Sequence, residues 1–314
     1  MFAYTIKRLL QSLVTLAVLA TAVFLMMRLM PEEGYFGEGF DRLDQVQIEA
    51  ALTQMGLRDP LPTQLCRYLS NLLRGDLGRS IVFRPQVPIS EIIAPKIPYS
   101  VYFGLASIAI SLIIGLPMGV MMARFKGRTP DLLGSGYVVL VKAVAPAVCY
   151  IFLQLYLSSW LRIPMLFNVR RPLSWILPVL CMSLGNVANY AMWMRRYMVD
   201  ELNRDYIRFA RAKGMSNSKI MTRHVLRNAF VPMAQLLPTS ILLTISGSIY
   251  VESLFSIPGM GGLLVNAIQR QDNTLVQALV LIFSCVGILG LFLGDVFMAM
   301  VDPRIKLDKR SGAR

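Results

Sequence analysis

The chain has 314 residues, of which 55% are hydrophobic and only 16% charged, and its mean hydropathy is +0.55. Soluble globular domains carry about 25% charged residues, so this composition excludes a soluble globular protein, and it equally excludes a disordered chain. In a soluble protein the net charge of +14 would suggest nucleic acid as a partner. In a membrane protein the same excess is expected from basic cytoplasmic loops, so no nucleic-acid partner is predicted.

Six apolar stretches are long enough to cross a bilayer as helices, which takes about 20 residues. They predict an all-α polytopic membrane protein with six transmembrane helices. The stretches are Leu9–Met27, Tyr99–Ala123, Leu132–Leu161, Pro172–Met194, Asn228–Val251 and Asn273–Gly294. The first could be a cleaved signal peptide, but its apolar run exceeds the usual ~7–15 residues and the sequence Met30-Pro31-Glu32-Glu33 is no A-x-A-like cleavage site. It is therefore expected to be retained as a helix.

The distribution of charge predicts the orientation in the membrane. Between the fourth and fifth stretches, residues 195–228 hold nine basic residues, and further basic residues lie near both ends of the chain. Residues 31–98 hold seven basic and nine acidic residues. Because short cytoplasmic loops carry the excess of Lys and Arg, both termini and the 195–228 loop are predicted to be cytoplasmic and residues 31–98 external.

The external segment is predicted to contain an amphipathic helix. Apolar residues recur at helical spacing after Pro62, and Gly75 suits the C-terminal cap of that helix. The apolar positions are Leu65, Tyr68, Leu69, Leu72 and Leu73. We interpret this helix as a structural cap that lies on the outer membrane surface or against the helix bundle.

Glycine pairs predict close packing between spans. Gly115-x-x-x-Gly119 and Gly290-x-x-x-Gly294 place small residues one turn apart on a helix face, which lets two helices approach closely.

Five polar residues lie in or near the apolar stretches. Lys142 interrupts the third stretch, where it either lines a polar pathway or extends toward the cytoplasmic edge of the membrane. Asn186 and Asn189 could line a pathway or bridge helices. Glu252 and Asp295 lie near the ends of their stretches, and we expect them to form structural pairs.

No motif of a catalytic site is present. The chain lacks G-x-x-x-x-G-K-[ST], H-E-x-x-H and G-x-S-x-G, so it has no P-loop for ATP and no metalloprotease or hydrolase signature. The four cysteines form no CxxC pair and His224 is the single histidine, which predicts neither a metal site nor a disulfide framework. A membrane enzyme, a receptor or a channel remains as an alternative class.

The cytoplasmic loop between the fourth and fifth stretches is predicted to form an elbow of two short helices. The first ends at Gly214, which suits a left-handed cap, and Ser216 can cap the second. Small side chains at Ala210, Ala212 and Gly214 would let a partner surface approach. A solvated basic loop that only fixes topology is the alternative, but such a loop needs neither these small residues nor its several apolar ones.

This loop resembles the coupling motif, or EAA loop, of bacterial ABC importer permeases in their peptide/nickel branch, which reads D-Y-V-R-T-A-R-A-K-G-L and then R-H-x-L-R-N-A. The chain departs from the branch at Phe209, where a small residue is usual, and has Arg208 where the generic loop has glutamate. The matching residues are Asp205, Tyr206, Arg208, Ala210, Arg211, Ala212, Lys213, Gly214, Arg223, His224, Leu226, Arg227, Asn228 and Ala229.

Further motifs in the family's order extend the resemblance over nearly the whole chain. The connection from Arg162 to Arg171 looks shorter than is usual in the family. The motifs are Tyr4-x-x-Lys-Arg-Leu-Leu, Arg28-Leu-Met-Pro, Met55-Gly-Leu-x-x-Pro-Leu-Pro, Leu72-Leu-Arg-Gly-Asp-Leu-Gly78, Trp175-Ile-Leu-Pro178, Val251-Glu-x-Leu-Phe-Ser-Ile-Pro-Gly-Met-Gly261 and Asp302-Pro-Arg304.

The resemblance implies a type I ABC importer permease fold in the bacterial inner membrane. It implies a second homologous permease subunit, two cytoplasmic ATPase subunits that bind ATP and Mg, and an external substrate-binding protein. Short peptides are the implied substrate, and nickel chelates or other small solutes are the alternative. The implied coupling residues are Asp205, Tyr206, Arg208, Phe209, Ala210, Arg211, Ala212, Lys213 and Gly214.

The corresponding organisation has four parts. Residues 1–30 are the first transmembrane helix, and 31–98 the external segment. Residues 99–301 form a five-helix core that includes the coupling loop 195–228, and 302–314 form a cytoplasmic tail.

Overall fold

The computed structural model describes residues 2–29, 36, 44–54, 56–245 and 248–301, and these residues form helices joined by short connections. The predicted cytoplasmic tail 302–314 lies outside the described residues. The elements are α1 (Phe2–Arg28), α2 (Gln45–Gln54), α3 (Leu61–Leu73), α4 (Ile89–Ile93), α5 (Ile97–Arg124), α6 (Thr129–Ala143), α7 (Pro146–Phe152), η3 (Leu153–Leu157), α8 (Ser158–Leu161), η4 (Pro172–Trp175), α9 (Ile176–Leu202), α10 (Asp205–Ala212), α11 (Asn217–Ile220), η5 (Met221–Val225), α12 (Leu226–Ile245), α13 (Ile249–Leu254), α14 (Met260–Gln269) and α15 (Asn273–Val301).

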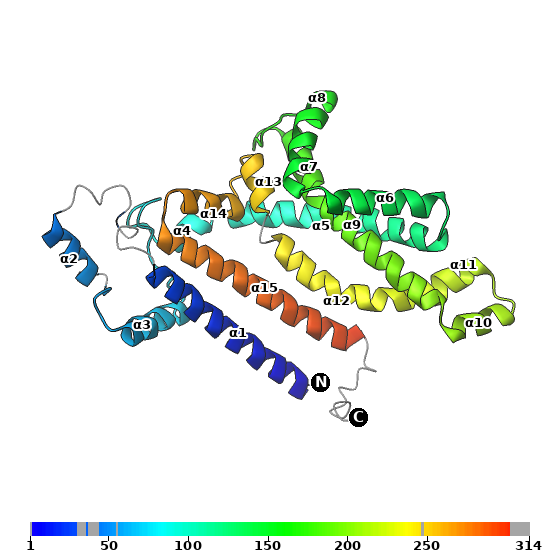
Figure 1. The fold of residues 1–314 in the computed structure, drawn as a ribbon, viewed down its shortest axis with the longest axis horizontal. Helices are drawn as coiled ribbons and strands as arrows, with labels where there is room; N and C mark the ends of the chain where they lie inside the picture. Colours follow the sequence, from blue (N-terminus) through cyan, green and yellow to red (C-terminus); the bar gives the residue numbers. More distant parts are fainter. Residues whose placement is uncertain (1, 30–35, 37–43, 55, 246–247, 302–314) are drawn as a thin grey trace.

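The long helices pack in pairs (Figure 1). α5 lies against α9, α12 against α15, and α1 covers α15. The elbow of α10 and α11 lies at one end of the molecule, and α2 and α3 lie at the opposite end. The elbow is therefore far from the predicted external segment, as the charge distribution requires.

Among the described residues, four helices are long and apolar enough to cross a membrane as single pieces, and the number is up to six if each of two bent helix pairs counts as one span. The four unbroken spans contain α1, α5, α9 and α15. The predicted third span is one of the bent pairs, because α6 and the segment Pro146–Leu161 meet at 106°. Pro146 explains the break: a proline disfavours helical geometry at the residue before it and lacks the N–H that would continue the helix. The expected continuous stretch Leu132–Leu161 is therefore corrected to two helices.

The predicted close packing at glycines is confirmed. A Cβ added to Gly119 would lie 2.6 Å from the carbonyl oxygen of Ala191 and 2.7 Å from Cβ of Met194, both on α9. A Cβ added to Gly115 would lie 2.9 Å from a backbone oxygen of the same helix. The absence of side chains at these positions lets α5 and α9 meet backbone to backbone.

Gly119→Val is expected to destabilise the α5–α9 pair by about 1–3 kcal/mol, because backbone cannot move aside for the added methyl groups. Gly136→Val on α6 is the matched control, since a Cβ there meets nothing within 4 Å. Thermal unfolding of the two purified variants in detergent checks this. Equal midpoints for both variants would contradict the assigned packing.

The amphipathic helix predicted after Pro62 is confirmed as α3. Its end has the bonds of a Schellman motif: the N–H of Gly75 donates to the carbonyl of Leu72 (3.0 Å) and the N–H of Asp76 donates to that of Asn71 (2.9 Å). Gly75 has φ +77°, a left-handed conformation that glycine adopts without strain.

Glu252 has the structural role expected of it. Its side chain is buried, and it accepts hydrogen bonds from Ser100 Oγ (2.8 Å) and from the N–H groups of Gly261 (2.7 Å) and Gly262 (3.0 Å). These N–H groups belong to the first turn of α14, so the carboxylate caps that helix from α13 and binds both to α5.

Three of the other polar residues contact a neighbouring helix, and the fourth, Asn189, is exposed. Asp295 on α15 pairs with Arg8 on α1 at 3.3 Å, as expected. The Asn186 amide on α9 lies 3.5 Å from the hydroxyl of Thr244 on α12. Lys142 is in the last turn of α6, next to the bend, with Nζ 3.3 Å from the sulfur of Met192.

Candidate functional site

The elbow between α9 and α12 has the local geometry that the sequence predicts. α10 ends with the N–H of Gly214 donating to the carbonyl of Arg211 (2.9 Å) and that of Met215 donating to the carbonyl of Ala210 (3.2 Å). Gly214 has φ +78°, so it is the left-handed residue of a Schellman motif. Ser216 Oγ then accepts a hydrogen bond from the N–H three residues on, at 3.4 Å, and caps α11.

One face of α10 is buried against the ends of the long helices. Ile207 is 0% exposed and Ala210 7%, and they pack in one cluster with Met194 and Met198 of α9 and with Val225 of η5. The expectation that Ala210 is open to a partner is thereby corrected, because Ala210 lies in this buried cluster. The buried face fixes α10 to the bundle.

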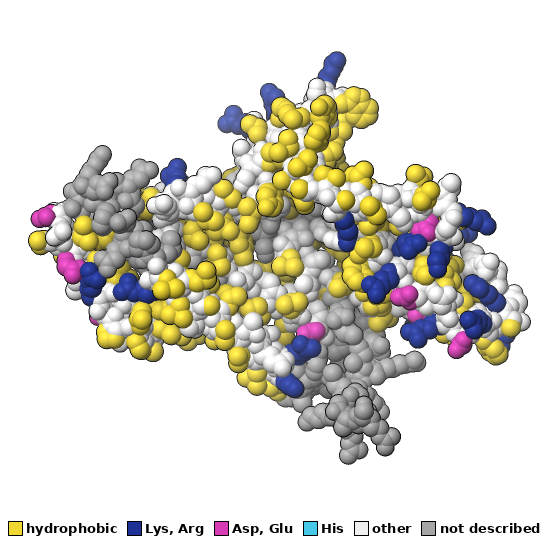
Figure 2. Space-filling model, in the orientation of Figure 1, with side chains coloured by type: hydrophobic (Ala, Val, Ile, Leu, Met, Phe, Trp, Pro, Cys, Tyr) yellow, Lys and Arg dark blue, Asp and Glu magenta, His cyan; other side chains and the backbone are white. Residues whose placement is uncertain are grey.

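The opposite face of α10 is exposed. Lys213 places Nζ 4.6 Å from the centre of the Phe209 ring, which is 61% exposed, and Arg208 pairs with Asp205 at 3.5 Å. Figure 2 shows basic side chains gathered at this end of the molecule. The exposed residues of the predicted set are Asp205, Tyr206, Arg208, Phe209, Arg211, Ala212, Lys213 and Gly214.

Three polar side chains link α10 to both neighbouring helices. The Tyr206 hydroxyl donates to Glu201 at the end of α9 and accepts a hydrogen bond from Asn228 Nδ2 at 2.8 Å, near the start of α12. Asn228 also donates to Glu201 at 3.2 Å. Desolvation, together with the hydrogen bond to the Glu201 carboxylate, raises the pKa of Tyr206 to about 12. The hydroxyl therefore stays protonated at neutral pH and remains a donor to Glu201.

This three-residue latch (Glu201, Tyr206, Asn228) was not predicted from the sequence. Tyr206 and Asn228 both belong to the loop motif, but 22 residues separate them, so their contact could be found only in the folded chain. Among the described residues, no group of three or more His, Cys, Asp or Glu side chains could hold a metal ion.

An ion pair between a partly exposed arginine and a buried carboxylate holds α6 to α9, and it was not predicted from the sequence either. Arg195 donates to both oxygens of Asp131, at 2.5 and 2.8 Å. Asp131 is 5% exposed and also accepts from the N–H of Gly127 at 2.9 Å. Because 64 residues separate the two partners, only the tertiary structure pairs them.

Comparison with known proteins identifies the family. Residues 115–307 match the binding-protein-dependent transport system inner membrane component, and residues 1–101 match the N-terminal part of such membrane components. The chain belongs to this family. The family is one of multi-pass membrane permeases, and the first of its two matches spans the elbow, α12 and α15.

Individual relatives cover most of the chain. It is 32% identical to the dipeptide transport system permease protein DppB of Bacillus subtilis, over 99% of this chain and 100% of that protein. It is 33% identical to the glutathione transport system permease protein GsiC of Pectobacterium atrosepticum, over 98% of this chain and 99% of that protein. The oligopeptide transport system permease protein AmiC of Streptococcus pneumoniae is 34% identical over 67% of this chain, and the match spans 42% of AmiC.

Proposed function

We propose that the chain is a membrane-spanning permease subunit of an ATP-driven ABC importer and forms half of its translocation pathway. The elbow is the observation that supports this proposal. One face of α10 is exposed, and its other face is buried in a cluster with residues of α9 and α12, in a chain of the permease family. The chain itself has no P-loop, so ATP and Mg would be bound by two cytoplasmic ATPase subunits. A second homologous permease and an external substrate-binding protein complete the complex.

In this proposal the exposed face of α10 docks on an ATPase subunit. Closure of the ATPase pair displaces α10, and the rigid attachment of α10 carries the displacement into the bundle. Two sets of contacts would transmit this displacement: the buried contacts of Ile207 and Ala210, and the latch through Tyr206. The bundle then alternates between inward-facing and outward-facing states.

Short peptides are the proposed substrate, because DppB, GsiC and AmiC are named as permeases for dipeptides, glutathione and oligopeptides. Nickel chelates or other small solutes are the second candidate. A receptor, channel or enzyme has no need of a docking elbow.

Uptake by the reconstituted complex tests the function. Proteoliposomes that contain both permeases, the ATPase subunits and the substrate-binding protein should accumulate a labelled dipeptide only with ATP and Mg. The purified chain alone should hydrolyse no ATP. Turnover in a preparation free of ATPase subunits would contradict the non-catalytic role, and uptake of nickel instead of peptides would replace the proposed substrate.

The proposed orientation places both termini in the cytoplasm and residues 31–98 outside, with the boundaries at 1–30, 31–98, 99–301 and 302–314. A membrane-impermeant thiol reagent added to intact cells should label Cys66, which is exposed on α3. In a variant without the native cysteines, Gly312→Cys should be labelled only after the cells are opened. Labelling of that residue from outside would reverse the topology.

A further inference from the structure

A cavity of about 370 Å³ lies where the end of α1 meets α3, the loop around residues 79–86 and the start of α15. It is separate from the elbow, at the other end of the molecule (Figure 1). Phe24 and Met27 of α1 form an apolar part of its wall, and the ring of Phe24 stacks on that of Tyr68 with centroids 5.5 Å apart.

The polar side chains of this cavity are matched to an anion. Arg28 and Arg79 line it, and no Asp or Glu is among the described residues that line it. Neither guanidinium pairs with a carboxylate in the described part of the chain: Arg28 donates to the backbone carbonyl of Leu57, and Arg79 donates to that of Gln86 at 3.0 Å. Each guanidinium has five N–H donors, so each keeps donors for a ligand.

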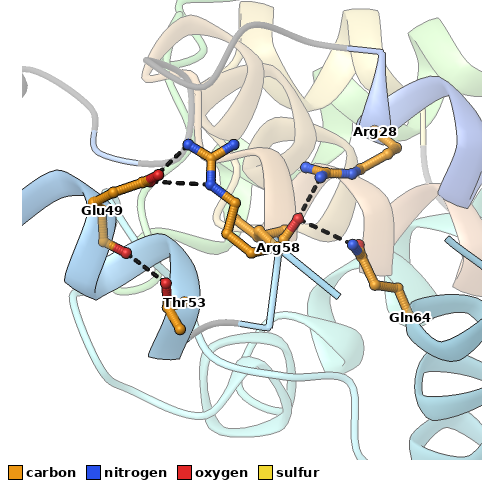
Figure 3. A network of polar contacts seen from close by, with 6 residues as sticks. Arg28, Glu49, Thr53, Arg58 and Gln64 are labelled. Carbon is orange, nitrogen blue, oxygen red and sulfur yellow. Dashed lines mark hydrogen bonds and ion pairs between the residues drawn. The ribbon is translucent and has the colours of Figure 1, made fainter. Parts of the chain in front are cut away.

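Two further polar side chains of the lining, Gln64 and Tyr68, differ in their hydrogen bonding. Figure 3 shows Gln64 and Arg28 directed at the same carbonyl, which belongs to Leu57, so the wall is fixed in place. The buried hydroxyl of Tyr68 interacts only weakly with the Gln277 side chain, which also lines the cavity, and makes no close hydrogen bond to a described residue. Leaving a buried hydroxyl unpaired costs free energy, and a ligand oxygen would satisfy it.

A nearby carboxylate, Asp272, forms no ion pair with the two arginines. Asp272 is fully buried beside the cavity wall and accepts hydrogen bonds from Ser80 Oγ (2.5 Å) and from the N–H groups of Val82 (3.1 Å), Phe83 (2.9 Å) and Leu275 (3.2 Å). Burial alone would raise the pKa of Asp272, but these hydrogen bonds outweigh it and hold the pKa below its usual value. The carboxylate is used to fix the loop to the start of α15.

The surroundings indicate that the anion is carried by a lipid. Only 6% of the residues in the apolar part of α1 are buried. The side chains beside the cavity face outward, with exposed fractions of 45% for Leu25, 69% for Met26 and 86% for Leu29. Such a surface suits acyl chains, while the end of a membrane helix lies at the level of the lipid headgroups. We propose that this cavity binds the phosphate group of an anionic membrane phospholipid, with Arg28, Arg79 and the Tyr68 hydroxyl as its ligands.

Native mass spectrometry of the purified full chain, titrated with phosphatidylglycerol or phosphatidylcholine, tests the proposal. Phosphatidylglycerol should bind at one tight site, and Arg28→Gln and Arg79→Gln should each weaken it about fivefold. Tyr68→Phe removes only the hydroxyl and should weaken binding roughly two- to tenfold. Arg74→Gln is the matched control, because Arg74 lies on the same external segment but not in the cavity, and it should bind as the parent chain does.

The arms of the experiment separate the possible sources of the phosphate. A large excess of inorganic phosphate should not displace the lipid, and phosphatidylcholine should bind more weakly because it has no net charge. Displacement by inorganic phosphate, or equal binding of both lipids, would overturn the assignment to an anionic lipid. Unchanged binding in the Tyr68→Phe and Arg79→Gln chains, both correctly folded, would overturn the assignment to this cavity.

Discussion

Replacing Gly214 with valine is expected to reduce uptake at least tenfold while the chain still inserts in the membrane. Gly214 has φ +78°, and a Cβ there meets nothing within 4 Å. The substitution is therefore harmful through backbone conformation alone, at a cost of about 1–3 kcal/mol for a β-branched residue held at positive φ. The elbow relieves this strain by changing the angle between α10 and α11, which misplaces Ala212 and Phe209 on the proposed docking face.

Gly214→Asn is the matched control, because asparagine adopts the left-handed conformation more readily than other non-glycine residues. Uptake and co-purification of the ATPase subunits should both be lost with valine and largely kept with asparagine. The amount of membrane-inserted chain should be near normal in both, since the spans are stabilised independently of this turn. Full uptake and an intact complex in the valine variant would refute the role of the elbow in coupling.

Arg195→Ala is expected to destabilise the folded chain by about 3 kcal/mol, because it leaves a buried carboxylate without its cation. Asp131 is 5% exposed and would keep only the N–H of Gly127 and the hydroxyl of Ser135, the latter at 3.5 Å. Thermal unfolding in detergent measures the loss. The contacts between α6 and α9 should loosen near the elbow, so uptake should fall as well.

Two further variants show whether the loss of stability comes from an unpaired buried charge or from lost packing. Arg196→Ala removes the next side chain along, an exposed guanidinium 5.2 Å from the Trp193 ring, and should cost less than about 1 kcal/mol. The double variant Asp131→Ala/Arg195→Ala removes both charges and should be more stable than Arg195→Ala. A double variant no more stable than the single one would show that the charge of Asp131 is not the cause.

The attachment of α10 to the bundle explains how a surface helix could act on a pathway. A helix held only by its ends would bend when displaced, whereas α10 has Ile207 and Ala210 inserted against α9. The latch through Tyr206 adds hydrogen bonds to the helices on both sides. Interior packing transmits displacement because it is dense and nearly incompressible.

The sequence by itself determined the features that depend on neighbours along the chain. Long apolar runs specify spans, because a helix in lipid must bury its polar backbone within itself. Gly75 and Gly214 specify helix ends, because a left-handed residue is needed there. The placement of Ser216 as a cap follows from the same local rule. The predicted helix ends and the cap held because each rests on contacts within a few residues.

The tertiary structure alone decided which side chains meet across the bundle. The burial of Ala210, the pairing of Asp131 with Arg195 and the hydrogen bond from Ser100 to Glu252 each depend on how the helices pack. The bend after α6 has a local cause in Pro146, but its angle depends on what the following helix packs against. Side-chain periodicity shows that a face is apolar and not which helix covers it, because burial of apolar area is non-directional. Partners for buried polar groups are set only when the helices dock.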